Sequence, residues 1–456
     1  MTGGPARAGV ARARGPTAAL TRLPPARYVS VPAQRETDRL TLRCRRAVAG
    51  HTHMRTMYLD ISVPRILLTR VLGRISRAAY FAPTSPLHLV DLPDPPLPAP
   101  DWVRVRNRLC GICGSDLHQI FVDAGLDVAP VALPSHRRIY LGHEMVGEVA
   151  EAGPAVRDFR LGDRVLRWGR ADDCRARGHE ALCPACTRGH RVLCERASEP
   201  REHHPVGGGF GDSFITPAST LLPVPAALTD EQAVLVEPAA VAIHAAWRRP
   251  AQPGERVLVV GAGIIGFLLI QAVKAFEPAC EITAVAQFPW QAELAAKQGA
   301  HHAFLSRDDG FAEVARLTGA RVYEGRAGNR MLMGGFDVIF DVVGTGATLN
   351  PALRWARAGG TVVLVGVSLH RMRLDVTPVW YQEVSLIGSV GHGVVTWRGE
   401  RVSTFDLAMR WMLDGTLATD GLVTHRFPLA AYREAFAAAV DKHIHRSVKV
   451  AFDLTR

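Results

Sequence analysis

Hydrophobic and polar residues alternate with a period of two in several short runs across the first half of the chain. In residues 102–108, for example, Val103 and Val105 alternate with Arg104 and Arg106. Residues 145–150 and 163–168 are comparable runs, and glycine and proline separate the runs from one another. Short alternating segments of this kind are typical of β-strands with one buried face. We therefore expect an irregular, β-rich region from about residue 57 to residue 244.

The pattern changes in the middle third of the chain, where apolar runs rich in β-branched residues alternate with helix-length segments. The expected strands are residues 256–260, 281–286, 336–343 and 360–367, and the expected helices include residues 290–298 and 349–358. Strands that alternate with helices predict a doubly wound parallel sheet. After about residue 387 mixed structure returns, with helices expected at residues 405–413 and 430–441 and a strand at 448–452.

A helix start is expected just before the middle third. Thr229 and Gln232 have the spacing of a capping box, and an apolar run through Val241 follows them.

The length of 456 residues exceeds that of one ordinary domain, so two domains are expected. We assign residues 57–245 and 388–456 to the β-rich domain, residues 246–387 to the parallel-sheet domain, and residues 1–56 to an N-terminal extension. Residues 1–53 hold ten arginines and only two acidic residues, a net charge of +8 out of +11 for the whole chain. The rest of the chain is therefore close to neutral, which argues against a nucleic-acid partner.

Three interpretations of the extension stay open. It is a disordered arm, an organelle-targeting peptide, or sequence translated from upstream of the true start. Met54 and Met57 lie just before the first expected strand and favour the third interpretation.

The chain carries no pattern of a secreted or membrane protein. The first thirty residues lack the apolar core of a secretory signal. The longest apolar run, residues 257–273, has 17 residues and three glycines, fewer than the roughly 20 residues that span a bilayer. Eight cysteines in a chain of this size favour metal binding over disulfides. We expect a cytoplasmic protein without a membrane partner.

A glycine-rich turn follows the first strand of the middle third and opens a helix that runs to about Phe276. Such a turn lets the backbone approach a pyrophosphate at the N-terminus of the helix, so it predicts a dinucleotide site. Residues expected beside the cofactor are Gly261, Gly263, Ile264, Ile265, Gly266, Ala286, Gln287, Val343 and Gly366. The second strand ends in Ala286-Gln287 without the acid that binds the ribose hydroxyls of NAD. NADP is therefore slightly favoured, and NAD stays open.

A thiolate and an imidazole thirty residues apart, Cys113 and His143, are donors that zinc takes, and Glu144 follows the imidazole directly. The motifs, in chain order, are Cys113-Gly114-Ser115-Asp116-x-His118, Gly142-His143-Glu144-x-x-Gly147 and the turn from Gly261 to Gly266. Together they resemble the zinc-dependent medium-chain alcohol dehydrogenases. Residues 235–244, which contain Glu237, resemble the polyol, sugar and threonine dehydrogenase branch of that family.

This resemblance implies a GroES-like catalytic domain, a Rossmann domain and a catalytic zinc held by Cys113 and His143. Glu144 and Glu237 would be direct or water-bridged carboxylate partners of the zinc, without a ranking between them. Glu144 as a purely structural carboxylate stays an alternative. Asp116 would orient the imidazole of His143.

The resemblance also assigns two residues to substrate chemistry. Ser115 would hydrogen-bond the substrate hydroxyl, and His118 could pass its proton toward solvent.

A second cysteine cluster resembles the lobe that holds a structural zinc in this family. It comprises Cys183, Cys186 and Cys194, with Cys174 nine residues before the first of them. Glu180 stands where the family has its first cysteine, so either Cys174 or Glu180 would be the fourth ligand. Four donors would close a tetrahedral site, and a degenerate lobe with free thiols is the alternative.

The expected activity is reversible oxidation of a secondary alcohol, polyol or sugar with NADP or NAD, assisted by zinc. An amino-alcohol substrate, such as threonine or an aminocyclitol, is the first alternative. A non-catalytic dinucleotide-binding protein is the second, and the presence of Cys113, His143 and Glu237 weighs against it. By resemblance we also expect a homo-dimer or homo-tetramer.

Overall fold

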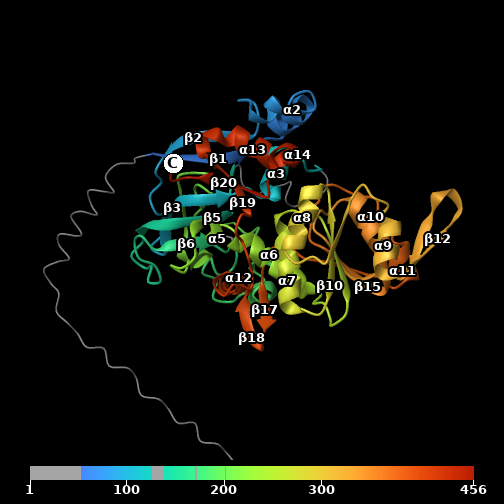
Figure 1. Ribbon diagram of the computed structural model, residues 1–456. Helices are drawn as coiled ribbons and strands as arrows, with labels where there is room; N and C mark the ends of the chain where they lie inside the picture. Colours follow the sequence, from blue (N-terminus) through green and yellow to red (C-terminus); the bar gives the residue numbers. More distant parts are fainter. Residues whose placement is uncertain (1–52, 126–137, 170–171, 201) are drawn as a thin grey trace, which may run out of the picture. The chain divides into compact units, whose positions relative to one another are not determined.

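A computed structural model of the chain describes residues 53–125, 138–169, 172–200 and 202–456. The expectations for residues 1–52 lie outside these described residues. The described residues form one compact unit, which contains two large sheets (Figure 1).

The middle third folds into a parallel six-stranded sheet of order β11-β10-β9-β14-β15-β16. Its strands are β9 (Arg256–Val260), β10 (Glu281–Ala286), β11 (His302–Leu305), β14 (Phe336–Asp341), β15 (Ala356–Leu364) and β16 (Ser385–Gly388). In order along the chain this is 3-2-1-4-5-6, the strand order of dinucleotide-binding Rossmann domains. The predicted doubly wound parallel sheet is confirmed.

Both faces of this sheet are covered by helices because successive side chains of a strand point to opposite faces. Val257 and Val259 of β9 belong to one apolar core, and Leu258 and Val260 belong to another. Figure 1 shows the helices on the two sides of the sheet. They are α7 (Ile264–Phe276) and α8 (Pro289–Lys297) on one side and α9 (Gly310–Thr318) and α10 (Gly346–Trp355) on the other.

The β-rich part is built on a mostly antiparallel sheet of order β19-β20-β3-β5-β6-β8, with β7 also paired to β3. Its strands are β3 (Trp102–Gly111), β5 (Glu144–Ala152), β6 (Arg164–Arg167), β7 (Ser213–Pro217), β8 (Leu221–Pro223), β19 (Val423–Pro428) and β20 (Lys449–Asp453). A smaller sheet contains β1 (His53–Asp60), β2 (Leu87–Pro93) and β4 (Arg138–Tyr140). The C-terminal segment therefore returns to the β-rich part and pairs with the strand that leads to Cys113.

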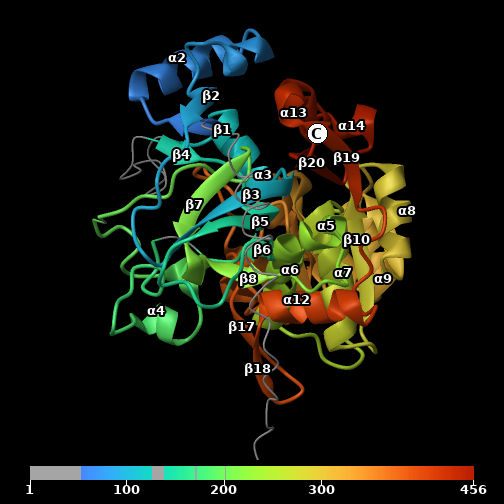
Figure 2. The same cartoon turned by 90° about the vertical axis from the view of Figure 1, so that its left-hand side faces the viewer.

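The remaining helices connect these sheets or pack on them. They are α2 (Val63–Gly73), α3 (Gly114–Ile120), α4 (Pro184–Thr187), α5 (Asp230–Ala233), α6 (Val236–Arg248), α11 (Thr377–Tyr381), α12 (Thr404–Leu413), α13 (Tyr432–Val440) and α14 (Lys442–His445). Thr229 caps α5 with the predicted capping box, because the Thr229 hydroxyl accepts from the Gln232 amide and the Gln232 side chain accepts from the Thr229 amide. Helix α12 packs beside α6 (Figure 2).

Two antiparallel strand pairs among the described residues form small sheets of their own. They are formed by β12 (Arg321–Glu324) with β13 (Arg330–Met333), and by β17 (Val394–Trp397) with β18 (Glu400–Ser403).

Several boundaries differ from the sequence-based expectation, and two of the differences have a clear physical reason. Strand β1 begins at His53, inside the segment assigned to the extension, because Met54 and Met57 are buried and the strand pairs with β2. The helix expected to reach residue 358 ends at Trp355, and β15 begins directly at Ala356. The reason is a bulge, because the register of β14 and β15 shifts near Gly359, whose φ of +69° suits glycine. The other domain boundaries stay a prediction.

No helix among the described residues is long and apolar enough to cross a bilayer.

Candidate active site

Cys113 is positioned by the junction between β3 and α3. It is the N-cap of α3, and the carboxylate of Asp116 accepts a hydrogen bond of 3.1 Å from the Cys113 amide. An acidic residue in the first turn is favourable here because the N-terminus of a helix exposes unpaired N–H groups. The short motif therefore fixes the direction of the thiol by local structure alone.

His143 lies opposite Cys113, at the start of β5. Its Nδ1 is 3.5 Å from the Asp116 carboxylate, as expected for a side chain that orients the ring. Burial acts to lower the pKa of His143, but the neighbouring Asp116 carboxylate and Cys113 thiol outweigh it, so the pKa lies well above its usual value. Gly142 precedes it with a φ of +87°, and a Cβ there would lie 2.5 Å from the Phe210 amide nitrogen. Only glycine fits at this turn.

Possible ligand atoms of Cys113, His143 and Glu144 all lie within 4.8 Å of one another. A thiolate, an imidazole and a carboxylate gathered in this way are the donor set of a zinc site, so these residues fit the metal.

Glu144 is engaged by a residue that the sequence analysis did not identify. Lys449 of β20 places its Nζ 2.7 Å and 2.5 Å from the two carboxylate oxygens of Glu144, and it also donates to the Ile112 carbonyl at 3.2 Å. The two residues are only 2% and 1% exposed. Burial acts to lower the pKa of Lys449, but the Glu144 carboxylate outweighs it and raises the pKa.

Glu237 of α6 lies outside the group of three ligand atoms but close enough to interact with it. Burial raises the pKa of Glu237 to about 7, with further increases from Glu144 and Asp116 and a decrease from His143. In the described part of the chain no hydrogen bond or ion pair to its carboxylate is found, so Glu237 is a carboxylate without a partner.

Ser115 and His118 both lie on α3, after Cys113. Both side chains are half-buried. The Nδ1 of His118 is 2.9 Å from the carboxylate of Asp123.

The glycine-rich turn between β9 and α7 has the shape of a phosphate cradle. Gly261 has a φ of +111°, and a Cβ there would lie 2.7 Å from Val343. A Cβ on Gly266 would lie 2.0 Å from the Gly261 carbonyl oxygen, whereas a Cβ on Gly263 would meet no atom nearer than 3.8 Å. Ile264 and Ile265 begin α7. The turn therefore fits a dinucleotide, because a bound pyrophosphate needs bare backbone at the N-terminus of the helix.

The loops after β14 and β15 meet beside this turn. A Cβ on Gly366 would lie 2.2 Å from the backbone of Val343, so the two loops are in direct contact. Buried Asp341 holds the first loop by accepting hydrogen bonds of 3.0 Å from the amides of Val343 and Gly344. The structure thus brings together Gly261, Val343 and Gly366, which are far apart in the sequence.

At the end of β10, Ala286 is buried and Gln287 is exposed. The side chain of Gln291 accepts hydrogen bonds from the Gln287 and Phe288 amides at 3.1 Å and 3.2 Å. The structure therefore leaves a neutral end to the second strand, as the sequence indicated.

Lys442 of α14 is a second residue that the sequence analysis missed. Its Nζ is 3.8 Å from the position of a Cβ on Gly263. Burial lowers the pKa of Lys442, and the positive charge of Lys449 lowers it further. No ion pair of Lys442 is found among the described residues, and a cation beside the cradle suits an anionic ligand. No sequence motif marks Lys442, whereas Lys449 could have been noticed as a cation inside an apolar strand.

The second cysteine cluster contains Cys174 and not Glu180. Ligand atoms of Cys174, Cys183, Cys186 and Cys194 all lie within 4.8 Å of one another. The Sγ atoms of Cys174 and Cys194 are 3.6 Å apart, whereas Glu180 is exposed. A hydrogen bond from the Cys186 amide lowers the pKa of Cys183 to about 6, which favours a thiolate. Four buried sulfurs in one lobe are a tetrahedral donor set for zinc.

Cys110 and His244 lie near these motifs in the sequence and are buried in the interior of the fold. Cys110 is fully buried, and a Cβ on Gly209 would lie 2.4 Å from its sulfur, so it packs in the core. His244 is a buried residue of α6.

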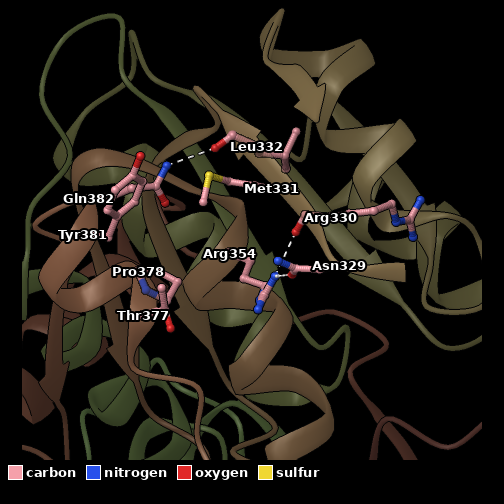
Figure 3. Close-up of a pocket in the computed structure, with 9 residues that line it drawn as sticks. All are labelled: Asn329, Arg330, Met331, Leu332, Arg354, Thr377, Pro378, Tyr381 and Gln382. Atoms are coloured by element: carbon pink, nitrogen blue, oxygen red, sulfur yellow. Dashed lines mark hydrogen bonds between the residues drawn. The ribbon is translucent and has the colours of Figure 1, made fainter. Parts of the chain in front are cut away.

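A cavity of about 90 Å³ between β13, α10 and α11 lies apart from these sites, since none of the candidate residues lines it (Figure 3). Arg354 is its prominent cation. The Arg354 guanidinium donates to Asn329 at 2.7 Å and to the Arg330 carbonyl at 2.8 Å, and it pairs with Asp375. With its donors engaged in this way, Arg354 has little capacity left to bind an anion.

Comparison with known proteins gives consistent matches. The family described as "Alcohol dehydrogenase GroES-like domain" matches residues 99–226, and the family described as "Zinc-binding dehydrogenase" matches residues 265–411. D-arabinitol dehydrogenase 1 of Uromyces fabae is 29% identical over 348 residues, which cover 75% of this chain and 88% of that protein. L-threonine 3-dehydrogenase of Chelativorans sp. is 30% identical over 350 residues, which cover 75% and 90% of the two proteins.

Among solved structures, a zinc-binding dehydrogenase of Sinorhizobium meliloti bound to NADP superimposes with a TM-score of 0.64. It is 24% identical, and the match covers 88% of this chain and 100% of that chain. At this identity the likeness concerns the fold.

Proposed function

Because the chain belongs to the zinc-dependent medium-chain alcohol dehydrogenase family, we propose that it oxidises a secondary alcohol of a polyol or sugar reversibly to a ketone. The observation that carries the proposal is the gathering of Cys113, His143 and Glu144 within 4.8 Å. Electrostatic proximity links this group to the nucleotide cradle. Glu144 pairs with Lys449, and the charge of Lys449 lowers the pKa of Lys442, whose Nζ lies beside Gly263.

In this proposal Cys113 and His143 hold a zinc ion, with a carboxylate from Glu144 or Glu237 as a further partner. When bound, zinc supplies a Lewis acid for the substrate oxygen, and the nicotinamide ring supplies the hydride acceptor. Asp116 fixes the ring of His143 through its carboxylate. Ser115 binds the substrate hydroxyl, and His118 accepts its proton.

The cofactor binds with its pyrophosphate at the N-terminus of α7, beside Ile264 and Ile265. Lys442 adds a positive charge at the same place. NADP is slightly favoured over NAD, because the neutral Gln287 does not repel a 2′-phosphate. The S. meliloti protein of the same fold binds NADP.

We further propose that Cys174, Cys183, Cys186 and Cys194 hold a structural zinc. The buried position and close spacing of the four sulfurs support it. An ion there would stabilise a lobe whose apolar cluster consists of little more than these cysteines.

The experiment that tests the function combines a zinc assay with a substrate screen. Purified protein is screened against polyols, sugars and amino alcohols with NAD and with NADP, and nicotinamide reduction is followed at 340 nm. Activity with a polyol or sugar and two zinc ions per chain support the proposal. Absence of zinc, or no reduction with any alcohol, would refute it. The zinc contents of the Glu144→Gln and Glu237→Gln variants decide which carboxylate binds the ion.

An amino-alcohol substrate is the second candidate, favoured by the 30% identity to an L-threonine 3-dehydrogenase. The same screen separates the two, because only this candidate predicts a preference for threonine or an aminocyclitol over polyols. A non-catalytic role is disfavoured because the complete donor set is present.

We also propose a homo-dimer or homo-tetramer in the cytoplasm. The exposed edge strand β16 offers backbone groups to a second copy. Light scattering of the purified protein measures the oligomeric state.

A further inference from the structure

A carboxylate outside the metal site bridges two histidines from different parts of the fold. Asp123 follows α3, and its two oxygens lie 2.9 Å from Nδ1 of His118 and 2.5 Å from Nε2 of His370. His370 follows β15 of the parallel sheet and is 247 residues away in the sequence. A backbone hydrogen bond of 2.7 Å from Gly125 to the Leu369 carbonyl joins the same two segments.

The backbone holds Asp123 in place. Val122 has a φ of +53°, an unusual conformation for a β-branched residue, which turns the chain sharply after α3. The amide of Asp123 then donates to the His118 carbonyl at 2.8 Å. Arg70 of α2 donates to the carbonyls of Val122 and Ala124 on either side of it. These contacts hold the turn in place, so the Asp123 carboxylate lies beside Nδ1 of His118.

His118, His370 and the guanidinium of Arg70 lie around the turn that carries Asp123. Partial burial acts to raise the pKa of Asp123, but hydrogen bonds from His370 and His118 outweigh this, so the pKa lies below its usual range. Arg70 is the nearby cation from α2, and its guanidinium is directed at backbone carbonyls. An ionised carboxylate beside an imidazole fixes which ring nitrogen carries the proton and stabilises the imidazolium when it forms.

We propose that Asp123 is a positioning residue for His118, keeping its Nδ1 protonated and its Nε2 free, and that His370 holds Asp123 from the nucleotide-binding half. This inference rests on the proposed function. The hydroxyl proton of the substrate passes through Ser115 to Nε2 of His118, and the hydride from the carbon goes to the oxidised nicotinamide cofactor that the proposed function supplies. Nδ1 keeps its own proton, which is hydrogen-bonded to the Asp123 carboxylate, and the carboxylate stays ionised. Nε2 then releases the transferred proton to water, so that one proton enters and one leaves in each turnover.

His370 also has a role in this arrangement. It is contributed by the loop beyond Gly366, which lies beside the cofactor cradle. His118 is therefore fully positioned only when this loop and the segment after α3 are in contact. Neither histidine touches a proposed metal ligand in the contacts described above, so the bridge can be altered without changing the zinc donors.

The test uses Asp123→Ala, Asp123→Glu and His370→Gln in the full chain. The matched control is Glu281→Gln, because Glu281 pairs with His302 at 2.8 Å on the parallel sheet with similar exposure. At pH 7, Asp123→Ala should lower kcat/KM for the alcohol about tenfold. This is less than the full rate contribution of a general base, because the variant keeps His118 itself. The pH profile of its kcat/KM should also change, because the variant lacks the carboxylate that stabilises the imidazolium of His118 when it forms.

Asp123→Glu should recover part of the loss, His370→Gln should lose less than Asp123→Ala, and Glu281→Gln should be unchanged. The dissociation constant of the cofactor, measured by fluorescence, should stay within about twofold in all four variants, since Asp123 acts through His118. An unchanged pH profile in Asp123→Ala, or an equal loss in Glu281→Gln, would overturn the inference.

A second readout does not need turnover. Nitrogen-15 NMR of the histidine rings, with His118 assigned from a His118→Gln variant, reports its tautomer directly. The Nδ1–H form should dominate in the unmutated protein and lose its dominance in Asp123→Ala, and an identical tautomer in both would contradict the inference. If the unmutated protein reduces no cofactor with any alcohol, the proposed function fails, while the NMR result still decides the role of Asp123.

Discussion

The buried ion pair of Lys449 and Glu144 gives the sharpest prediction about stability. Replacing Lys449 by Met keeps most of the side-chain volume but removes the cation that contacts both oxygens of Glu144 at 2.7 Å and 2.5 Å. Unit charges about 3 Å apart attract by about 5.5 kcal/mol at an effective dielectric constant of about 20. Because both residues are almost fully buried, water cannot replace the lost partner.

We therefore expect Lys449→Met to lower the free energy of unfolding by about 3–5 kcal/mol, the usual cost of leaving one charge of a buried pair alone. Glu144→Gln should cost a similar amount, since it leaves Lys449 unpaired. The double variant should lose only about 1–2 kcal/mol, because two neutral side chains of similar shape need no partner charge.

The assay is urea unfolding followed by tryptophan fluorescence, with zinc content measured in each sample. Arg410→Met is the control, because Arg410 and Glu400 form an ion pair at 2.8 Å on the surface with 51% and 57% exposure, and its loss should change little. If the double variant lost the sum of the two single losses, Lys449 and Glu144 would not be coupled and the reasoning would be refuted.

Four further predictions concern the metal sites, the cofactor and pH. Cys113→Ser should reduce turnover at least about a thousandfold while cofactor binding, followed by fluorescence, is kept; full activity would exclude the metal assignment. Cys174→Ser should remove one zinc per chain by elemental analysis, whereas Glu180→Gln should retain both, and the reverse would make Glu180 the ligand. Lys442→Gln should weaken cofactor binding about five- to tenfold by calorimetry without changing zinc content, and unaltered binding would place Lys442 outside the site. Burial lowers the pKa of His244 to about 4, so below pH 6.5 the unfolded chain binds a proton that the folded chain does not, and stability falls as the pH drops from 6.5 toward 4. Between pH 6.5 and 5 the free energy of unfolding, measured in urea, should fall by about 1.5 kcal/mol more in the unmutated protein than in His244→Asn. Equal losses in the two proteins would contradict this prediction.

The parallel sheet was predictable because its signal is local. Residues 257–260 of strand β9 are apolar without interruption, and the glycine turn and helix follow them directly. Cys113 and His143 could be chosen as candidate donors for the same reason, since each stands in a short motif, and the structure brings the two side chains together. The end of the helix at Trp355 was misplaced because a bulge near Gly359 depends on pairing with β14, which no local pattern records.

The sequence by itself determined the elements, the family and most of the candidate donors, because these depend on periodicity and on short motifs. It left open whether Cys174 or Glu180 completes the cysteine cluster, and the fold brings Cys174 to the other three sulfurs. Only the tertiary structure decided the partner of Glu144 and the bridge from Asp123 to His370. Both join segments hundreds of residues apart, and such contacts depend on how sheets pack and chains return, which a linear pattern of residues does not encode.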